Sequence, residues 1–283
     1  MTPFRHCRHV IDSRNHHAIK RIRRLHERAE RDRTGLSYIE GMRFIARAVQ
    51  HRVPIEALVS CRPLLTHPFA RHLVRQLRQT GTPILEVTPD VLSSVALVDD
   101  PQGIGAVVRQ RWTPLERVVS ANDSCWIMLD TVRSPGNLGT ILRTSEAVGG
   151  AGLILLGEAV DPYDPATVRA SMGSLFSQRC VRTTLADVRR WKDRQQCVLV
   201  GTAPSAVTDY QEVDYRAPTV LLLGGERKGL SSELRALCDV VVRIPMLGDT
   251  DSLNLSVAAS LLLYEVFNQR RRGASLAVTH GAQ

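Results

Sequence analysis

Three segments in the second half of the chain each begin at the end of a short apolar run and turn through glycine or proline into polar residues. They are DTVRSPGNLGTILR (residues 130–143), LLLGGERKGL (221–230) and IPMLGDTDSLN (244–254). Domains that alternate strands and helices bind ligands at the carboxyl ends of their strands, which is where these segments lie. Each segment taken alone is an ordinary strand-end turn, so their information lies in their common order and spacing.

The side chains in these segments offer a guanidinium, a carboxylate and several amide and hydroxyl groups. Asn137 lies where a helix is expected to begin, so it can also serve simply as the helix N-cap. Arg143 follows six residues later, and a lone arginine on a helix is usually only solvated. Glu226 directly follows Gly224 and Gly225, and glycine at a strand end lets the backbone approach a ligand closely.

Several function classes are disfavoured by what the sequence lacks. No G-x-x-x-x-G-K-[ST] segment occurs, and the glycine-rich run at 149–152 precedes an apolar strand instead of following one, which argues against kinases and NAD-binding enzymes. The six cysteines are scattered without a C-x-x-C pair, so neither a disulfide framework nor a metal site is expected, and a cytoplasmic location fits. No membrane span and no secretory signal are expected.

The elements that must position these segments are predicted to form two α/β domains, residues 1–110 and 124–283, joined by a linker at 111–123. The second domain has continuous apolar strands alternating with helices, which predicts a mostly parallel sheet covered on both faces. Strands are expected over 57–60, 83–87, 104–109, 126–129, 153–156, 198–200, 220–223 and 240–244, and helices over 13–33, 43–50, 69–79, 138–148 and 187–194, followed by a long last helix with Asp251 or Ser252 as its N-cap.

The charge of the chain is concentrated at its front. Lys and Arg number 37 against 28 Asp and Glu, and residues 1–52 alone hold twelve Arg and one Lys against five acids. This clustering predicts a polyanionic partner, most plausibly nucleic acid, although a merely solvated basic helix would give the same pattern. The arginines expected to contact RNA phosphates are Arg21, Arg23, Arg24, Arg28, Arg31 and Arg33.

Together, the three segments resemble the three motifs of the SpoU (TrmH) family of RNA ribose 2′-O-methyltransferases, which belong to the SPOUT class. The resemblance spans residues 124–270 and includes VRASMGSLF at 168–176. Upstream, Ile39-Glu40-Gly41 and Pro101-Gln102-Gly103-Ile104 resemble the substrate-binding domain of many members. The resemblance implies an α/β fold with a C-terminal trefoil-knotted methyltransferase domain and a smaller N-terminal domain like ribosomal protein L30e.

The activity implied by the resemblance is methyl transfer from S-adenosylmethionine to a ribose 2′-hydroxyl, with ribosomal RNA as the expected substrate. The nearest subgroup includes enzymes that confer antibiotic resistance. A homodimer through the C-terminal domain is also implied, with Tyr264, Phe267 and Asn268 of the last helix as candidates for its interface. Two alternatives stay open: a transfer RNA 2′-O-methyltransferase, and a non-catalytic RNA-binding ribosome assembly factor, which would need no S-adenosylmethionine.

The resemblance also assigns roles to individual residues. Arg143 is placed at the reacting hydroxyl, and because a guanidinium has a pKa above about 12, it is expected to hold a phosphate and stabilise developing negative charge, leaving the final proton acceptor open. Asn137 is expected to orient Arg143 or the ribose, and Glu226 to pair with Arg143. Ser252 and Asn254 complete the reacting centre, and the residues expected around the cofactor are Leu223, Gly224, Ile244, Met246 and Leu253.

Overall fold

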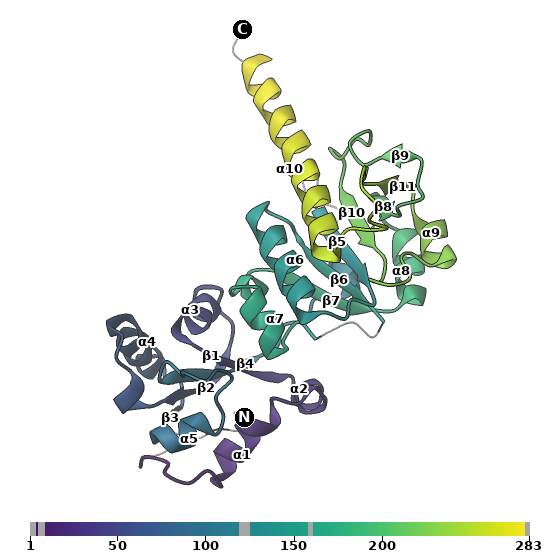
Figure 1. Cartoon of the computed structure of the whole chain (residues 1–283). Helices are drawn as coiled ribbons and strands as arrows, with labels where there is room; N and C mark the ends of the chain where they lie inside the picture. Colours follow the sequence, from purple (N-terminus) through teal and green to yellow (C-terminus); the bar gives the residue numbers. More distant parts are fainter. Residues whose placement is uncertain (1–3, 5–8, 119–124, 158–160, 281–283) are drawn as a thin grey trace. The chain divides into compact units, whose positions relative to one another are not determined.

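The chain divides into two compact units in the computed structural model (Figure 1). One unit comprises Met1–Arg111 with Asp161–Ser177, and the other Trp112–Val160 with Gln178–Gln283. The sequence had placed residues 161–177 in the second domain, but they pack with the first. Of the expected linker, residues 112–118 pack in the second unit, where Leu115 is buried, and residues 119–123 lie outside the described part. The residues described are 4, 9–118, 125–157 and 161–280.

The first unit contains a four-stranded sheet in the order β1-β4-β2-β3. β1 (Leu36–Glu40) and β2 (Ile55–Ser60) both pair antiparallel with β4 (Ile104–Arg109), and β3 (Ile84–Glu86) pairs parallel with β2. The predicted strands near 57–60, 83–87 and 104–109 are confirmed. β1 was not predicted because Ser37 and Glu40 interrupt its apolar pattern, although all five of its residues are buried.

Helices surround this sheet, and the one predicted over 13–33 is two helices in the structure. A turn at Leu25–Glu27 separates them, because the guanidinium of Arg31 donates to the carbonyl oxygens of Leu25 (3.0 Å) and His26 (2.7 Å). Those oxygens would accept helical hydrogen bonds if the helix continued. The helices of this unit are α1 (His17–Arg24), α2 (Arg28–Thr34), α3 (Met42–Gln50), η1 (Arg62–Leu64), α4 (Pro68–Gln79), α5 (Pro89–Ser93), α7 (Pro165–Ala170) and η3 (Ser174–Phe176).

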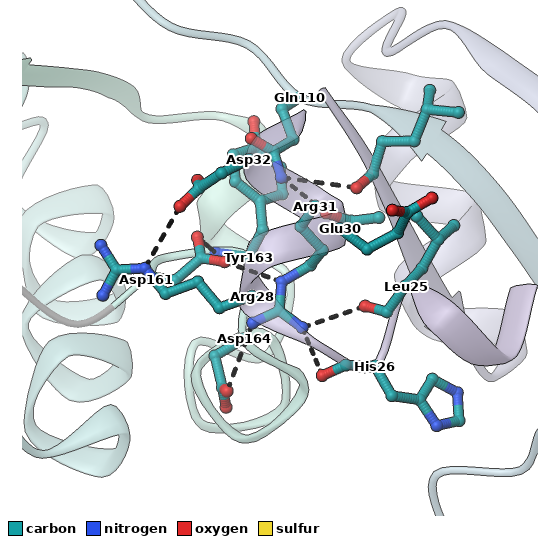
Figure 2. A network of polar contacts seen from close by, with 12 residues as sticks. Leu25, His26, Arg28, Glu30, Arg31, Asp32, Gln110, Asp161, Tyr163 and Asp164 are labelled. Atoms are coloured by element: carbon teal, nitrogen blue, oxygen red, sulfur yellow. Dashed lines mark hydrogen bonds and ion pairs between the residues drawn. The ribbon is translucent and has the colours of Figure 1, made fainter. Parts of the chain in front are cut away.

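Arg31 is buried in a network of polar contacts (Figure 2), with 2% of its side chain exposed. Its Nε lies 2.7 Å from Oδ2 of Asp161, which is equally buried, and its Nη2 lies 3.6 Å from Oδ2 of Asp164. A buried charge is tolerated only when paired and hydrogen-bonded in this way. The prediction that Arg31 contacts RNA is therefore wrong, and the residue instead ties α2 to the segment before α7.

The second unit contains a seven-stranded sheet in the order β7-β6-β5-β10-β8-β11-β9, in which every neighbouring pair is parallel. This confirms the predicted parallel sheet. The edge strands β7 and β9 were not predicted because polar residues interrupt the apolar pattern of both. The strands are β5 (Cys125–Asp130), β6 (Gly152–Leu156), β7 (Arg179–Thr183), β8 (Val198–Thr202), β9 (Thr208–Asp209), β10 (Thr219–Leu223) and β11 (Val240–Arg243).

Both faces of the central strands are buried, as their apolar sequences require. Alternate residues point to opposite faces, so Trp126 and Met128 of β5 share a cluster with Val188 of α8 and Leu234 of α9. α6 and α10 pack against each other and against the central strands (Figure 1). The helices of this unit are η2 (Leu115–Arg117), α6 (Pro135–Ala147), α8 (Leu185–Lys192), α9 (Ser232–Leu237) and α10 (Leu255–His280).

The strand order creates a switch point in the middle of this sheet. From β5 the chain proceeds outward to β6 and β7, then crosses to the other side of β5 to form β8 and β10. Loops that leave neighbouring strands in opposite directions open a crevice at their carboxyl ends. The knotted path implied by the family resemblance stays a prediction. Among the described residues, no helix has both the length and the apolar character needed to span a membrane.

Replacing Arg31 by Met is expected to lower the free energy of unfolding by about 3–5 kcal/mol, because it leaves the carboxylate of Asp161 buried without its partner. The matched control is Arg33→Met, which removes an exposed ion pair with Glu30 and should change stability by about 0.5 kcal/mol or less. Urea unfolding followed by circular dichroism measures both, and equal stability of the two variants would contradict the structural role of Arg31.

Candidate functional site

A cavity of about 680 Å³ lies at the carboxyl ends of four parallel strands in the second unit. The loops after β5, β10 and β11 line it, so the three segments singled out in the sequence meet at one place. The fourth contribution, Thr202 to Pro204 at the end of β8, was not expected. Its signal in the sequence was the same as for the others, a polar turn directly after an apolar strand.

A chain of hydrogen bonds joins the three segments across the rim of this cavity. Asn137 donates through Nδ2 to the carboxylate of Glu226, and its Oδ1 accepts from Nδ2 of Asn254 at 3.1 Å. Oδ1 of Asn254 in turn accepts from the backbone N–H of Ser256 at 2.9 Å and from its hydroxyl at 2.7 Å. One residue from each segment is therefore held by the next.

The two ends of this chain fix the orientation of both amides. The carboxylate oxygen of Glu226 accepts from Asn137, and the backbone N–H of Ser256 can only donate. Asn137 must therefore turn its NH₂ group toward Glu226, and Asn254 must turn its oxygen toward Ser256. The arrangement is internally consistent, which is the property that makes a polar network specify a single geometry.

Helix capping explains why Asn137 and Asn254 are available in these positions. α6 begins at Pro135, and Ser134 is its N-cap, with its hydroxyl accepting from the backbone N–H of Asn137 at 3.3 Å. Asn137 is thus not the N-cap, and its side chain is free to bridge the other two segments. The prediction that Asp251 or Ser252 is the N-cap of α10 is wrong. The helix begins at Leu255, and Oδ1 of Asn254 accepts from the backbone N–H of Ser256 in its first turn.

Gly224 brings two backbone segments together beneath the cavity. A Cβ atom placed on Gly224 would lie 2.1 Å from the carbonyl carbon of Gly229 and 2.3 Å from the nitrogen of Leu230. The backbone N–H of Gly229 donates to the oxygen of Gly225 at 2.9 Å, which closes the turn between them. Only glycine fits at 224, and the close approach presents backbone groups to the cavity.

All five residues expected around the cofactor line this cavity. Leu223 and Gly224 come from the end of β10, and Ile244, Met246 and Leu253 from the segment after β11. Four of them, all but Gly224, add apolar side chains to a cavity that Asn137, Glu226 and Asn254 also line. An apolar cavity with a few converging polar groups is the usual form of a small-molecule site.

Asn137, Glu226, Ser252 and Asn254 line the cavity, but Arg143 does not. Arg143 is exposed on α6, because six residues turn a helix through about 600° and leave its side chain well away from that of Asn137. The expected pairing of Glu226 with Arg143 is absent, since Glu226 is held by Asn137 instead.

Two basic side chains at the cavity, Arg227 and Lys228, were also not singled out in the sequence. They lie in the tight turn between Gly225 and Gly229, and both are exposed. Their signal was their position directly after Glu226. Within the described residues, no group of three His, Cys, Asp or Glu side chains is arranged to hold a metal ion.

The remaining arginines expected to contact RNA belong to the first unit, and most have partners there. Of these, Arg21 and Arg24 are exposed on α1, with Arg21 lying over the ring of Phe4. The others bind neighbours: Arg23 donates to Ser94, Arg28 lies 3.4 Å from Asp32, and Arg33 lies 2.6 Å from Glu30. Net positive charge is lost only where an arginine is paired with a carboxylate, as Arg28 and Arg33 are.

Comparison with known protein families gives two matches along the chain. Residues 124–264 match the SpoU rRNA Methylase family, and residues 16–106 match the MRM3-like substrate binding domain. Over 256 residues the chain is 38% identical to the 23S rRNA (uridine(2479)-2′-O)-methyltransferase of Streptomyces viridochromogenes, covering 88% of each chain. It is 28% identical to a Bacillus subtilis 23S rRNA (guanosine(2553)-2′-O)-methyltransferase, covering 90% of this chain and 98% of the relative.

Solved structures show the same architecture over nearly the whole chain. An rRNA methyltransferase from Sinorhizobium meliloti with bound AdoMet superposes with a TM-score of 0.85 at 34% identity, covering 92% of this chain and 97% of that one. The SpoU methyltransferase AviRb from Streptomyces viridochromogenes in complex with AdoMet superposes with a TM-score of 0.84 at 36% identity, covering 90% and 98%.

Replacing Gly224 by Ala is expected to weaken binding of S-adenosylmethionine by about tenfold or more, because the added methyl group forces the backbone at Gly229 to move. Gly225→Ala is the matched control, since a Cβ there first meets Asp130 at an ordinary 3.5 Å. Calorimetric titration of both variants measures the difference. Equal affinities for the two variants would show that the backbone approach does not shape the binding site.

Proposed function

The chain belongs to the SpoU rRNA methylase family, and we propose that it methylates a ribose 2′-hydroxyl of 23S ribosomal RNA with S-adenosylmethionine as the methyl donor. The observation that carries the proposal is the hydrogen-bonded chain of Glu226, Asn137 and Asn254 at the rim of a cavity with apolar walls. A non-catalytic RNA-binding protein needs neither this series of hydrogen bonds nor the cavity.

The cavity fits a nucleoside-sized ligand that combines an apolar face with polar ends. Ile244 and Leu253 supply apolar contacts for an adenosine ring, and the backbone at Gly224 allows close approach. When bound, S-adenosylmethionine supplies a methyl group already activated by the positive sulfonium. The protein must therefore align the acceptor hydroxyl with that methyl group and assist removal of its proton.

Residues at the rim are placed to perform this alignment. Asn137 is held rigid by one hydrogen bond on each side, and the carboxylate of Glu226 retains a second oxygen for another donor. Ser252 is exposed at the same rim and adds a hydroxyl group. We propose that these groups would orient the ribose 2′-hydroxyl toward the methyl group that bound S-adenosylmethionine would supply. Transfer would form the C–O bond as the methyl C–S bond of the sulfonium breaks, with S-adenosylhomocysteine and a proton as the leaving products.

We assign Arg143 to the RNA and not to the cofactor. Its guanidinium is exposed on α6 and outside the residues that line the cavity. From this position it can hold a phosphate beside the target ribose and stabilise negative charge that develops on the attacking oxygen. It does not need to touch S-adenosylmethionine to play this part.

We also propose that the second unit forms a homodimer through α10. Val257, Leu261 and Tyr264 recur at helical spacing and are 47%, 37% and 47% exposed. Tyr264 also contacts the ring of Phe267 edge to face, which extends the apolar stripe. A continuous apolar stripe on a helix favours burial against another surface, and a second copy presents a self-complementary one.

Incubation with tritiated S-adenosylmethionine and 23S ribosomal RNA is expected to place label on ribose, in a linkage that resists alkaline hydrolysis at the modified nucleotide. Arg143→Ala should lower kcat/KM by about 10²- to 10³-fold while leaving S-adenosylmethionine affinity unchanged. Thr140→Ala, one turn earlier on the same exposed face of α6, should keep activity. Label found only on bases, or only on transfer RNA, would contradict the proposed substrate.

Leu261→Glu is expected to convert the dimer to a monomer, because it places a charge in the centre of the apolar stripe. Sedimentation velocity measures the change in mass. Val207→Glu alters a side chain that is 89% exposed and is not part of the apolar stripe, so it should leave the dimer intact. A Leu261→Glu protein that sediments as the wild type would exclude this interface.

A further inference from the structure

A second cavity, of about 690 Å³, lies in the first unit between η1, α4 and β3. We propose that this cavity, the arginine groove, binds the phosphodiester backbone of the RNA substrate. The proposal rests on the function proposed above, since it assigns the surface that holds the substrate of that reaction. The charged side chains that line it are Arg62, Arg71, Arg75, Arg78 and Glu86.

The spacing along α4 places three of these arginines on one face of the helix. Arg71, Arg75 and Arg78 recur at i, i+4 and i+7, whereas Leu73 and Leu77 on another face are buried in the domain. A seven-residue span rises about 10 Å along a helix axis. The cations therefore form a stripe, which suits an extended polyanion better than a single small anion.

Contacts with the protein hold both ends of this stripe in place. Arg71 donates to the carbonyl oxygens of Leu65 at 2.9 Å and Thr66 at 2.8 Å. Arg78 lies 2.7 Å from one oxygen of Glu86, and Arg62 lies 3.9 Å from the other. Carbonyl contacts fix a guanidinium without neutralising it, and the two remaining arginines must share one carboxylate.

Arg75, between these two ends, is exposed and has no hydrogen bond or ion pair within the described part of the chain. The charged groups lining the groove thus carry four positive charges against one negative charge. Like charges gathered around a concavity repel one another, and nothing in the packing of α4 requires them. This uncompensated charge indicates an anionic ligand from outside the domain.

The groove differs in this respect from the arginine-rich helix α2 at the front of the chain. Arg28 and Arg33 each have a carboxylate of their own nearby, and Arg31 is buried. Exposed pairs of that kind contribute little net electrostatic field, whereas a groove whose lining is mostly of one sign of charge focuses that field. The arginines of α2 therefore contribute less to a phosphate-binding surface than those of the groove.

The test uses the full-length protein and a fluorescently labelled 23S ribosomal RNA transcript, with affinity measured by fluorescence anisotropy at several salt concentrations and without cofactor. Arg75→Gln is expected to weaken binding about fivefold, and the Arg71→Gln/Arg75→Gln pair more than tenfold. Each lost phosphate contact should also make the dependence of log affinity on log salt less steep by about 0.7–0.9. Glutamine keeps the helix, because its helix propensity is close to that of arginine.

Glu86→Gln supplies a readout of opposite sign. It removes the one carboxylate in the groove, so RNA affinity should rise about twofold or more, a change that damage to the fold would not produce. Arg190→Gln removes an exposed, paired arginine of the second unit and should leave affinity unchanged. Competition with inorganic tripolyphosphate at equal phosphate concentration should displace little RNA, whereas full displacement would indicate a site for small anions.

The groove is excluded if Arg75→Gln binds RNA as the wild type, if Glu86→Gln weakens binding, or if Arg24→Gln on α1 has the larger effect. These outcomes are separate from failure of the proposed methyltransferase activity. A wild-type protein that binds RNA through the groove but transfers no methyl group would refute the activity alone. If the wild-type protein methylates RNA and the groove variants bind RNA as tightly as the wild type, the proposed RNA-binding groove alone is refuted.

Discussion

The hydrogen bond between Asn254 and Asn137 joins two residues 117 positions apart, and much of the site depends on it. It can form only because the parallel sheet brings the carboxyl ends of β5 and β11 to one edge and because both residues lie at helix starts. Ser134 caps α6, so Asn137 is not consumed as a cap. With Glu226 attached at the other side, the loops that line the cavity are held by one another, which is the preorganisation that a transfer reaction requires.

The fold was largely readable from the sequence where strands are buried on both faces. β5, β6 and β10 are continuous apolar runs, and their positions follow directly from that pattern. Strands of mixed composition, such as β1, were not predicted from the sequence. The burial of Ser37 and Glu40 depends on tertiary contacts that a local sequence pattern does not contain. Likewise, the break between α1 and α2 depends on Arg31, whose partner Asp161 lies 130 residues away.

The residues of the site could be predicted from the sequence, but the hydrogen bonds between them could not. Strand-end position was enough to select Asn137, Glu226 and Asn254, which line one cavity. The hydrogen-bond partners of these side chains were not predictable. α6 begins two residues before Asn137, so Asn137 and Arg143 both lie within the helix and point in different directions, which leaves Arg143 away from Glu226. Charge counting failed for a related reason. It cannot tell an arginine that is paired, such as Arg33, from one that is free to meet a polyanion, such as Arg75.

The buried ion pair also limits how the first unit can be treated. The chain passes between the two units three times, and Asp161–Ser177 returns to the first unit after β6 has formed in the second. A fragment ending at Arg111 would lack Asp161 and Asp164, and the guanidinium of Arg31 would lose both of its carboxylate partners. Breaking a buried ion pair costs several kcal/mol, a large share of the stability of a small domain. The first unit is thus completed by Asp161–Ser177, which follow β6 of the second unit, so residues 1–111 alone lack part of its packing.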